Sequence, residues 1–131
     1  MEFCRAWGDG ATARPDVNKI VSMFAEHGVW QLWMPGGPVI KGRAALLAEI
    51  ERQCGFSSFM QCGITKIVSS GAVVVTERVD HFTMHDVRVE HALMAIYEID
   101  SDGKIAAWRE YFDTADLGKQ LGMHPEAVIA G

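Results

Sequence analysis

Residues 59–112 read FMQCGITKIVSSGAVVVTERVDHFTMHDVRVEHALMAIYEIDSDGKIAAWREYF and contain most of the strand-forming sequence of this chain. Apolar and polar residues alternate along much of this stretch with the period of two that β-strands show. Turn sequences containing Gly, Ser or Asp interrupt the alternation three times. The stretch therefore predicts an antiparallel meander of four strands, over residues 59–69, 73–84, 87–99 and 104–112.

The sequence on either side of this meander predicts helices. Residues 16–27 and 43–54 both place apolar side chains at helical spacing, and residues 30–34 form a short strand between them. A last short helix runs from about Asp113 to Gly122, and residues 123–131 are expected to form a loosely held tail. We therefore expect one α+β domain over residues 1–131, in which the inner face of the sheet wraps either the helices or a cavity.

The strand phase places charged side chains on the inner face of this sheet. Arg78 and Asp80 share a face with Phe82, and Glu110 shares a face with Trp108 and Phe112. His91, Leu93 and Ala95 have the matching phase on the strand between them. Because a charge on an apolar face is costly unless it is paired, we expect Arg78, Asp80 and Glu110 to converge in one cavity. Arg109, Tyr111 and Asp113 are expected on the opposite face.

The composition excludes several classes of function. The net charge is −5, and the Lys and Arg residues are scattered, so we expect no nucleic-acid partner. No apolar run approaches the roughly 18 residues of a membrane span. The cysteines, Cys4, Cys54 and Cys62, are odd in number and the histidines lack ligand spacing, so the sequence predicts a reduced, cytoplasmic protein without a metal site.

Several segments resemble one known family, the limonene epoxide hydrolases, which share the nuclear transport factor 2-like fold with ketosteroid isomerase and scytalone dehydratase. The matching segments cover about residues 1–122 and are Phe24-Ala25-Glu26, Met34-Pro35, Gly42-Arg43, Thr76-Glu77-Arg78-Val79-Asp80, Gly103-Lys104-Ile105 and Trp108-Arg109-Glu110-Tyr111-Phe112-Asp113. The resemblance implies a conical α+β fold with a deep apolar pocket, often dimerised through its sheet. It also implies one-step epoxide hydrolysis by an Asp-Arg-Asp triad, with no cofactor.

Carried over by position, the resemblance implies that Asp80 is the general acid and Arg78 the bridging arginine. Glu110 falls where the family has the aspartate that acts as general base, so the base of this chain is one methylene longer. A carboxylate of either length can accept a proton from water, but catalytic placement is sensitive to shifts of about an ångström.

A second departure concerns the strand before Pro35. The family places a tyrosine and an asparagine there to orient the attacking water, whereas residues 30–34 read WQLWM. If the segment is aligned to the family from the helix before it, Trp30 and Leu32 stand at those two places. If it is aligned back from Met34-Pro35, Gln31 and Trp33 stand there. If Gln31 points into the cavity beside Glu110, a water site survives. If the strand presents Trp and Leu instead, a reaction that activates no water gains support.

We expect the substrate to be a small, largely apolar epoxide or a related terpenoid-like or polyketide-like molecule, and the protein to be a homodimer. The candidate pocket residues are Trp30, Gln31, Leu32, Trp33, Phe82, His91, Leu93, Trp108 and Phe112. For His91 the sequence leaves open a hydrogen-bonded core histidine or a pocket acid or base. Two other functions remain open: a proton-shuttling isomerase, dehydratase or epoxide-opening cyclase, and a dimeric module that only binds a hydrophobic ligand.

Overall fold

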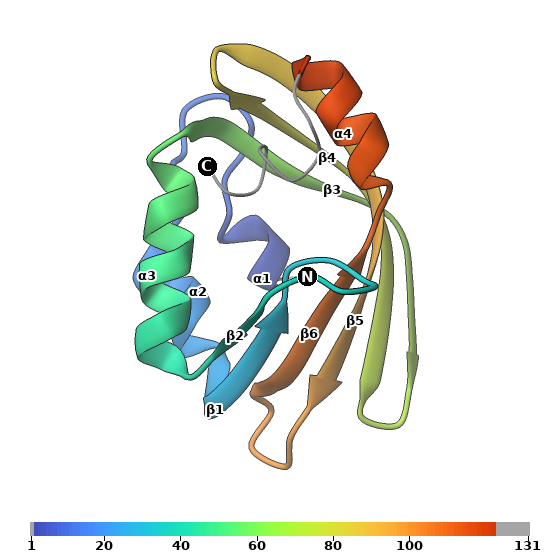
Figure 1. Cartoon of the computed structure of the whole chain (residues 1–131). Helices are drawn as coiled ribbons and strands as arrows, with labels where there is room; N and C mark the ends of the chain where they lie inside the picture. The colour runs from blue at the N-terminus through green and yellow to red at the C-terminus, as the bar shows by residue number, and fades with distance from the viewer. Residues whose placement is uncertain (1, 123–131) are drawn as a thin grey trace.

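The computed structural model describes residues 2–122 and consists of a six-stranded mixed sheet with helices against it. The sheet curves, and the helices α1, α2 and α3 lie on its inner side, whereas α4 lies at one end beside β5 (Figure 1). The strand order is β2-β1-β6-β5-β4-β3. The elements are α1 (Glu2–Arg5), α2 (Val17–Ser22), β1 (Phe24–Gln31), β2 (Val39–Lys41), α3 (Arg43–Cys54), β3 (Ser57–Ser70), β4 (Val73–Met84), β5 (Val87–Ile99), β6 (Ile105–Tyr111) and α4 (Thr114–Leu121).

The predicted antiparallel meander from β3 to β6 is confirmed. Each neighbouring pair in it is antiparallel, and the observed strand bounds differ from the predicted ones by only a few residues. The turn between β4 and β5 consists of His85 (φ 50°) and Asp86 (φ 64°). Two successive residues with positive φ produce the tight hairpin turn that matches strand twist. This hairpin sets the register that places Asp80 opposite His91.

The prediction of a helix over residues 16–27 is wrong in its second half. The helix α2 begins after Asp16, whose carboxylate accepts a hydrogen bond from the Lys19 backbone N–H (3.1 Å), and it ends at Ser22. The next residues form β1 because its backbone pairs with both β2 and β6. At Gly28 a Cβ atom would lie 2.8 Å from the Ile105 carbonyl oxygen, so this close pairing needs glycine. Tertiary pairing here overrides the local helical spacing.

The antiparallel order of the predicted meander does not extend over the whole sheet. The strand β1 pairs in parallel with β6, so the first long strand lies beside the last one, and β2 extends the edge. Periodicity indicates which face of a strand is buried but contains no information about its partner or its direction. The short elements α1 and β2 were not predicted, because four and three residues are too few to show a period.

Two apolar clusters fill the space between the sheet and the helices. The larger one joins α1 and α3 to the inner face of β1, β5 and β6, and the smaller one consists of Phe82, Met84, Val89 and Leu117. The predicted helix over 43–54 is confirmed as α3, and the Arg43 side chain anchors its start by two hydrogen bonds to the Phe24 carbonyl (3.0 and 2.7 Å). The gap between the two clusters contains the cavity described below.

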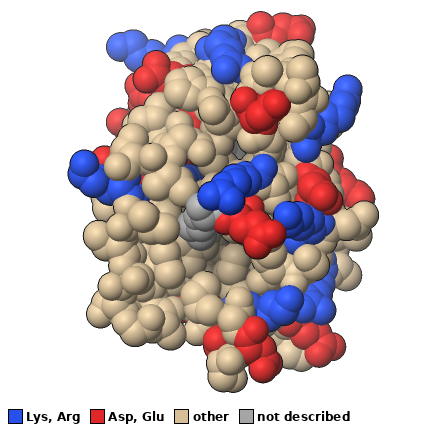
Figure 2. Space-filling model, turned by 180° about the vertical axis from the view of Figure 1, so that it is seen from behind, with Lys and Arg blue, Asp and Glu red and all other residues tan. Residues whose placement is uncertain are grey.

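No helix among residues 2–122 is long and apolar enough to cross a membrane. The last predicted helix is confirmed as α4, which begins after the N-cap Asp113 and ends at Gly122 in a left-handed conformation. The predicted tail, residues 123–131, lies outside the described residues. Acidic and basic side chains are interspersed on the face that Figure 2 shows.

Candidate active site

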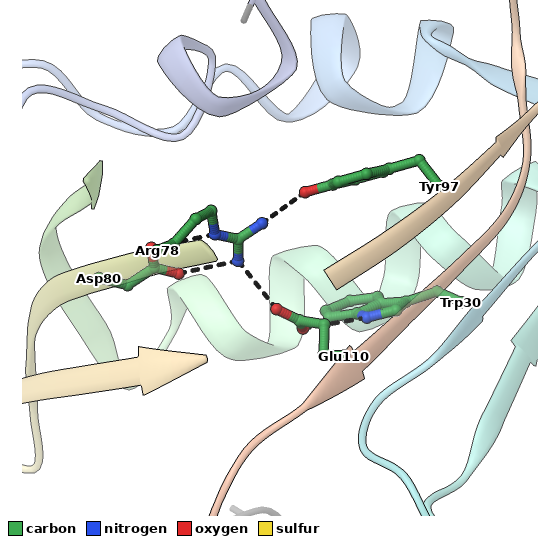
Figure 3. A network of polar contacts seen from close by, with 5 residues as sticks. All are labelled: Trp30, Arg78, Asp80, Tyr97 and Glu110. Carbon is green, nitrogen blue, oxygen red and sulfur yellow. Dashed lines mark hydrogen bonds and ion pairs between the residues drawn. The ribbon is translucent and has the colours of Figure 1, made fainter. Parts of the chain in front are cut away.

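Arg78 lies at the centre of a network of polar side chains on the inner face of the sheet (Figure 3). Its guanidinium donates two hydrogen bonds to Asp80, from Nε to Oδ1 (3.2 Å) and from Nη2 to Oδ2 (2.9 Å). Nη2 also donates to Glu110 Oε2 (2.9 Å), and Nη1 donates to the Tyr97 hydroxyl. The predicted convergence of Arg78, Asp80 and Glu110 is therefore confirmed as geometry, whereas their catalytic roles remain predictions.

The network is almost fully removed from solvent. The side chains of Arg78, Asp80 and Glu110 are 2%, 14% and 11% exposed. Loss of solvent raises the pKa of Glu110 to about 7, although Arg78 acts to lower it, and the charge of Asp80 raises it further. Burial also raises the pKa of Asp80, again against the opposing effect of Arg78. Two carboxyls that share one cation in this way titrate as a pair, so they retain one proton at higher pH than isolated carboxyls do.

Trp30 holds the other oxygen of Glu110. Its indole N–H donates to Glu110 Oε1 (3.2 Å), and its ring stacks on Trp108 with centroids 4.4 Å apart and planes 9° apart. Trp108 in turn stacks on Tyr97, with centroids 5.9 Å apart. Both oxygens of Glu110 therefore have a fixed donor, and the aromatic stack fixes the position of one of these donors.

A cavity of about 110 Å³ opens beside this network. Six of the nine predicted pocket residues line it, namely Trp30, Leu32, Phe82, His91, Trp108 and Phe112. Asp80, Arg78 and Glu110 also face it. The cavity wall therefore combines the polar network with members of the small apolar cluster, Phe82, Met84 and Leu117.

Gln31, Trp33 and Leu93 do not line the cavity, so their prediction as pocket residues is wrong. Gln31 points away from Glu110, and its amide donates to the Gly37 carbonyl (3.3 Å). Trp33 follows the end of β1 and packs against the larger apolar cluster. Leu93 is buried on the predicted face, but it lies directly opposite Arg78 in the ladder and packs beside the ion network.

The structure bears on the two alignments considered for the first strand. Trp30 and Leu32 line the cavity and Gln31 does not, which favours the alignment that puts Trp30 and Leu32 at the places of the tyrosine and the asparagine. An indole N–H can donate a hydrogen bond but cannot accept one, and leucine can do neither. The polar pair that would hold an attacking water is therefore replaced by one donor, and that donor binds Glu110.

The sequence did not identify Tyr97 and Trp7 as site residues. Tyr97 follows His91, Leu93 and Ala95 with the same period of two, so extending the strand phase by two residues would have found it. Trp7 lies just after α1 and lines the cavity, but no period in the sequence pointed to it. Further lining residues that were not predicted are Arg52, Gln53, Phe56, Ser57, Met60, Gln61, Cys62, His81, Met84 and Leu117.

Within residues 2–122 no group of three or more His, Cys, Asp or Glu side chains is arranged to hold a metal ion. The cation in the site is the guanidinium of Arg78, which occupies the space between the two carboxyls. The arrangement offers two proton-exchanging groups, a fixed positive charge and an adjacent cavity, which suffices for general acid–base chemistry.

Residues 12–122 match the family model described as the limonene-1,2-epoxide hydrolase catalytic domain. This chain belongs to the limonene-1,2-epoxide hydrolase family. The resemblance drawn from the sequence is thereby confirmed. Arg78 and Asp80 lie on β4 and Glu110 lies on β6.

Two relatives come from Mycobacterium tuberculosis. The chain is 37% identical over 78 residues to epoxide hydrolase EphG, an alignment that covers 60% of this chain and 49% of the relative. The chain thus spans about half the length of this curated relative. A solved structure of an LEH-like epoxide hydrolase is 28% identical, covers 92% of this chain and 86% of its own, and superposes with a TM-score of 0.73.

A third similarity concerns the fold alone. A hypothetical protein with a ketosteroid isomerase-like fold from Catenulispora acidiphila, solved with trimethylamine, is 18% identical and superposes with a TM-score of 0.78 over 95% of both chains. The predicted nuclear transport factor 2-like α+β fold is therefore confirmed, with the correction that its sheet is mixed.

Proposed function

We propose that this protein adds water to a small epoxide and releases a diol, by general acid–base catalysis without a covalent intermediate. One observation supports this proposal above the others: Arg78 hydrogen-bonds to both Asp80 and Glu110 in a buried cavity. Membership of the limonene-1,2-epoxide hydrolase family and the names of the two mycobacterial relatives support the same reaction class.

In the proposed reaction Asp80 gives its proton to the epoxide oxygen as the C–O bond breaks. Glu110 takes a proton from the water whose oxygen forms the new C–O bond. A carboxyl with a pKa of about 7 suits this role, because it is substantially ionised near neutral pH and still basic enough to accept a proton. Asp80 ends ionised and Glu110 protonated, and one proton passed from Glu110 to Asp80 beside Arg78 restores the starting state.

A second function is favoured by the end of β1. Trp30 and Leu32 take the places of the water-holding residues, and Gln31 points elsewhere. A substrate that carries its own hydroxyl would need no held water, since that hydroxyl could attack the ring and lose its proton to Glu110. The product would then be a cyclic ether, as in an epoxide-opening cyclase, and the same acid and base would serve.

One experiment separates the two reactions. Purified protein is incubated in oxygen-18 water with a panel of cyclic epoxides and hydroxy-epoxides, and the products are analysed by mass spectrometry. Hydrolysis without a covalent intermediate gives a diol with one solvent oxygen in a single turnover, whereas cyclisation gives an unlabelled ether. An unlabelled diol in the first turnover, with enzyme in excess, would contradict the proposed mechanism, because its oxygen would come from a carboxylate.

The matched variants are Asp80→Asn, Glu110→Gln and Glu98→Gln. Glu98 lies on β5 and pairs with Arg109 outside the cavity, so its substitution tests whether losing any strand carboxylate affects turnover. We expect the first two variants to lose turnover and Glu98→Gln to retain it. Absence of turnover of the whole panel by the wild-type protein would contradict both proposed reactions and would favour a binding role.

A further inference from the structure

His91 is a second polar group in the cavity wall, separate from the Arg78 network. It lies on the inner face of β5, directly opposite Asp80 in the β4–β5 ladder, and is 8% exposed. Its ring meets those of Phe82 and Phe112 nearly edge to face, with centroids 5.9 and 4.4 Å away and interplanar angles of 71° and 73°. These two aromatic rings hold the imidazole in one orientation.

Within the described part of the chain, the imidazole of His91 forms no hydrogen bond, and neither does the indole N–H of Trp108, whereas other polar groups near the cavity do. The Trp30 indole binds Glu110, and the Tyr97 hydroxyl binds Arg78. Buried polar side chains nearly always have a hydrogen-bond partner. Because His91 lines the cavity and neither neighbouring aromatic ring can act as a normal partner, a molecule in that cavity, water or a ligand, can supply the partner.

The protonation state of His91 limits which kinds of molecule it can bind. Burial lowers the pKa of His91 to about 4, and the charge of Arg78 lowers it in the same direction, while Asp116 opposes them. The ring is therefore neutral near pH 7 and offers one N–H donor and one nitrogen acceptor. A neutral imidazole between phenyl rings suits a hydroxyl or carbonyl oxygen and gives little stabilisation to a carboxylate or phosphate.

We infer that His91 binds a hydroxyl or carbonyl oxygen of the substrate, so that the natural substrate is an oxygenated epoxide rather than a hydrocarbon epoxide. This inference rests on the proposed function and adds to it the class of substrate. Residues directly opposite in an antiparallel ladder have Cβ atoms roughly 4.5–5.5 Å apart. An oxygen bound by His91 and an epoxide oxygen bound by Asp80 can therefore belong to one small molecule.

A binding measurement tests the inferred role of His91 without any turnover. The ligands are cyclohexene oxide and 2,3-epoxycyclohexan-1-ol, which differ by one hydroxyl, and the protein is Asp80→Asn, in which the proposed acid is absent. Quenching of tryptophan fluorescence reports binding, since Trp30 and Trp108 line the cavity. We expect the hydroxy-epoxide to bind tenfold or more tightly than the hydrocarbon epoxide, and His91→Leu introduced alongside Asp80→Asn to abolish that preference.

A second variant and a spectroscopic measurement separate recognition from a merely structural role. His91→Asn keeps a donor and an acceptor, so we expect it to restore part of the preference that His91→Leu loses. In nitrogen-15 NMR, the imidazole signals of His91 should shift when the hydroxy-epoxide is added and stay in place when the hydrocarbon epoxide is added. A preference that survives in His91→Leu, or unmoved His91 signals, would overturn the inference.

Turnover gives an independent result. With wild-type protein and His91→Leu, we expect KM for the hydroxy-epoxide to rise about tenfold relative to KM for cyclohexene oxide. A fall of kcat by the same factor for both substrates, with KM unchanged, would make His91 a proton-transfer residue and overturn its role in specificity. If neither epoxide reacts but the binding preference is found, the proposed function fails while the ligand class stands.

Discussion

Two arginine–glutamate pairs lie on the same sheet and differ chiefly in their surroundings. Arg78 binds Glu110 across the inner face, where the two side chains are 2% and 11% exposed. Arg109, the residue beside Glu110 on β6, binds Glu98 on the other face, where the two side chains are 29% and 49% exposed. The contact distances are similar, 2.9 and 2.6 Å.

This contrast shows that burial rather than contact geometry separates a candidate site from an ordinary surface pair. An exposed pair is screened by water and contributes under about 1 kcal/mol. In the buried pair, loss of solvent raises the pKa of Glu110 to about 7, so its protonation can change under ordinary conditions. Strand alternation alone produces both environments, because neighbouring residues on β6 face opposite sides.

The largest effect is expected from removing proton transfer at the buried site. Asp80→Asn and Glu110→Gln keep the shape of the side chain but cannot exchange the proton, so each should lower kcat/KM for an epoxide by about 10²–10⁴-fold. Circular dichroism and thermal unfolding would check that the fold is retained. Wild-type activity in both variants would show that the reaction does not use these carboxyls.

Breaking the buried network should cost the most stability. Arg78→Met fills similar space but leaves Asp80 and Glu110 without their cation, and we expect a loss of about 3–5 kcal/mol in the free energy of unfolding. Urea unfolding at neutral pH measures this loss. A change below about 1 kcal/mol would mean that the buried pair behaves like the exposed one.

Shortening the base tests how closely Glu110 matches its neighbours. In Glu110→Asp the carboxyl is drawn back, and it cannot keep its contacts to both Trp30 and Arg78 unless the backbone moves. We expect kcat/KM to fall by about 10- to 100-fold, or about 1.4–2.7 kcal/mol of transition-state stabilisation. An unchanged or higher rate would indicate that the cavity is built for the shorter aspartate that the family resemblance implies.

Two buried groups, Glu110 and His91, should make the free energy of unfolding change with pH in opposite directions. The pKa of Glu110 is raised from 4.5 to about 7, so the stability that it contributes in protonated form is lost as pH rises through that range. The pKa of His91 is lowered from 6.5 to about 4, so the stability of its neutral form is lost as pH falls through that range.

Between about pH 4.5 and 6.5 we therefore expect the variants to change the slope of unfolding free energy against pH in opposite directions. Glu110→Gln should make stability rise more steeply with pH than in the wild type, and His91→Leu should make it rise less steeply. Each change is at most about 1.4 kcal/mol per pH unit, the effect of one proton. Urea unfolding at several pH values measures both slopes, and two variants with the wild-type slope would refute the assignment.

The smallest effect is expected on the exposed face. Arg109→Met breaks the contact with Glu98, and we expect a loss of under about 1 kcal/mol in unfolding free energy and no measurable loss of activity. The Arg78→Met measurement made under the same conditions is the matched comparison. A loss as large as that of Arg78→Met would remove the distinction between the two faces.

Strand alternation was sufficient to predict the four-stranded meander and the meeting of Arg78, Asp80 and Glu110. The period of two assigns each residue to a face, and an antiparallel meander brings neighbouring faces together. The family resemblance supplied the proposed roles. Local sequence also predicted α3 to the residue and placed the last helix between about Asp113 and Gly122, where α4 lies.

The features of the fold and the site that the sequence did not predict depend on long-range contacts, which cannot be read from local sequence. Residues 24–27 have helical spacing, yet they belong to β1, which pairs with β6 at Phe24 and again from Val29 onward, and with β2 from Val29 to Gln31. The choice between Trp30 with Leu32 and Gln31 with Trp33 followed from the same pairing, which fixes Trp30 opposite Trp108. Trp7 reaches the cavity because α1 packs inside the sheet, and a four-residue helix shows no period.

The titration of Glu110 tests the central claim most directly, because the proposed chemistry depends on a buried carboxyl that changes protonation near neutral pH. Carbon-13 NMR of the glutamate carboxyls would follow it, with the Glu110 signal assigned by its loss in Glu110→Gln. A midpoint near pH 7 is the predicted result. A midpoint at or below the ordinary value of 4.5 would contradict the account, since Glu110 would then be an ion-paired structural carboxylate and a poor base.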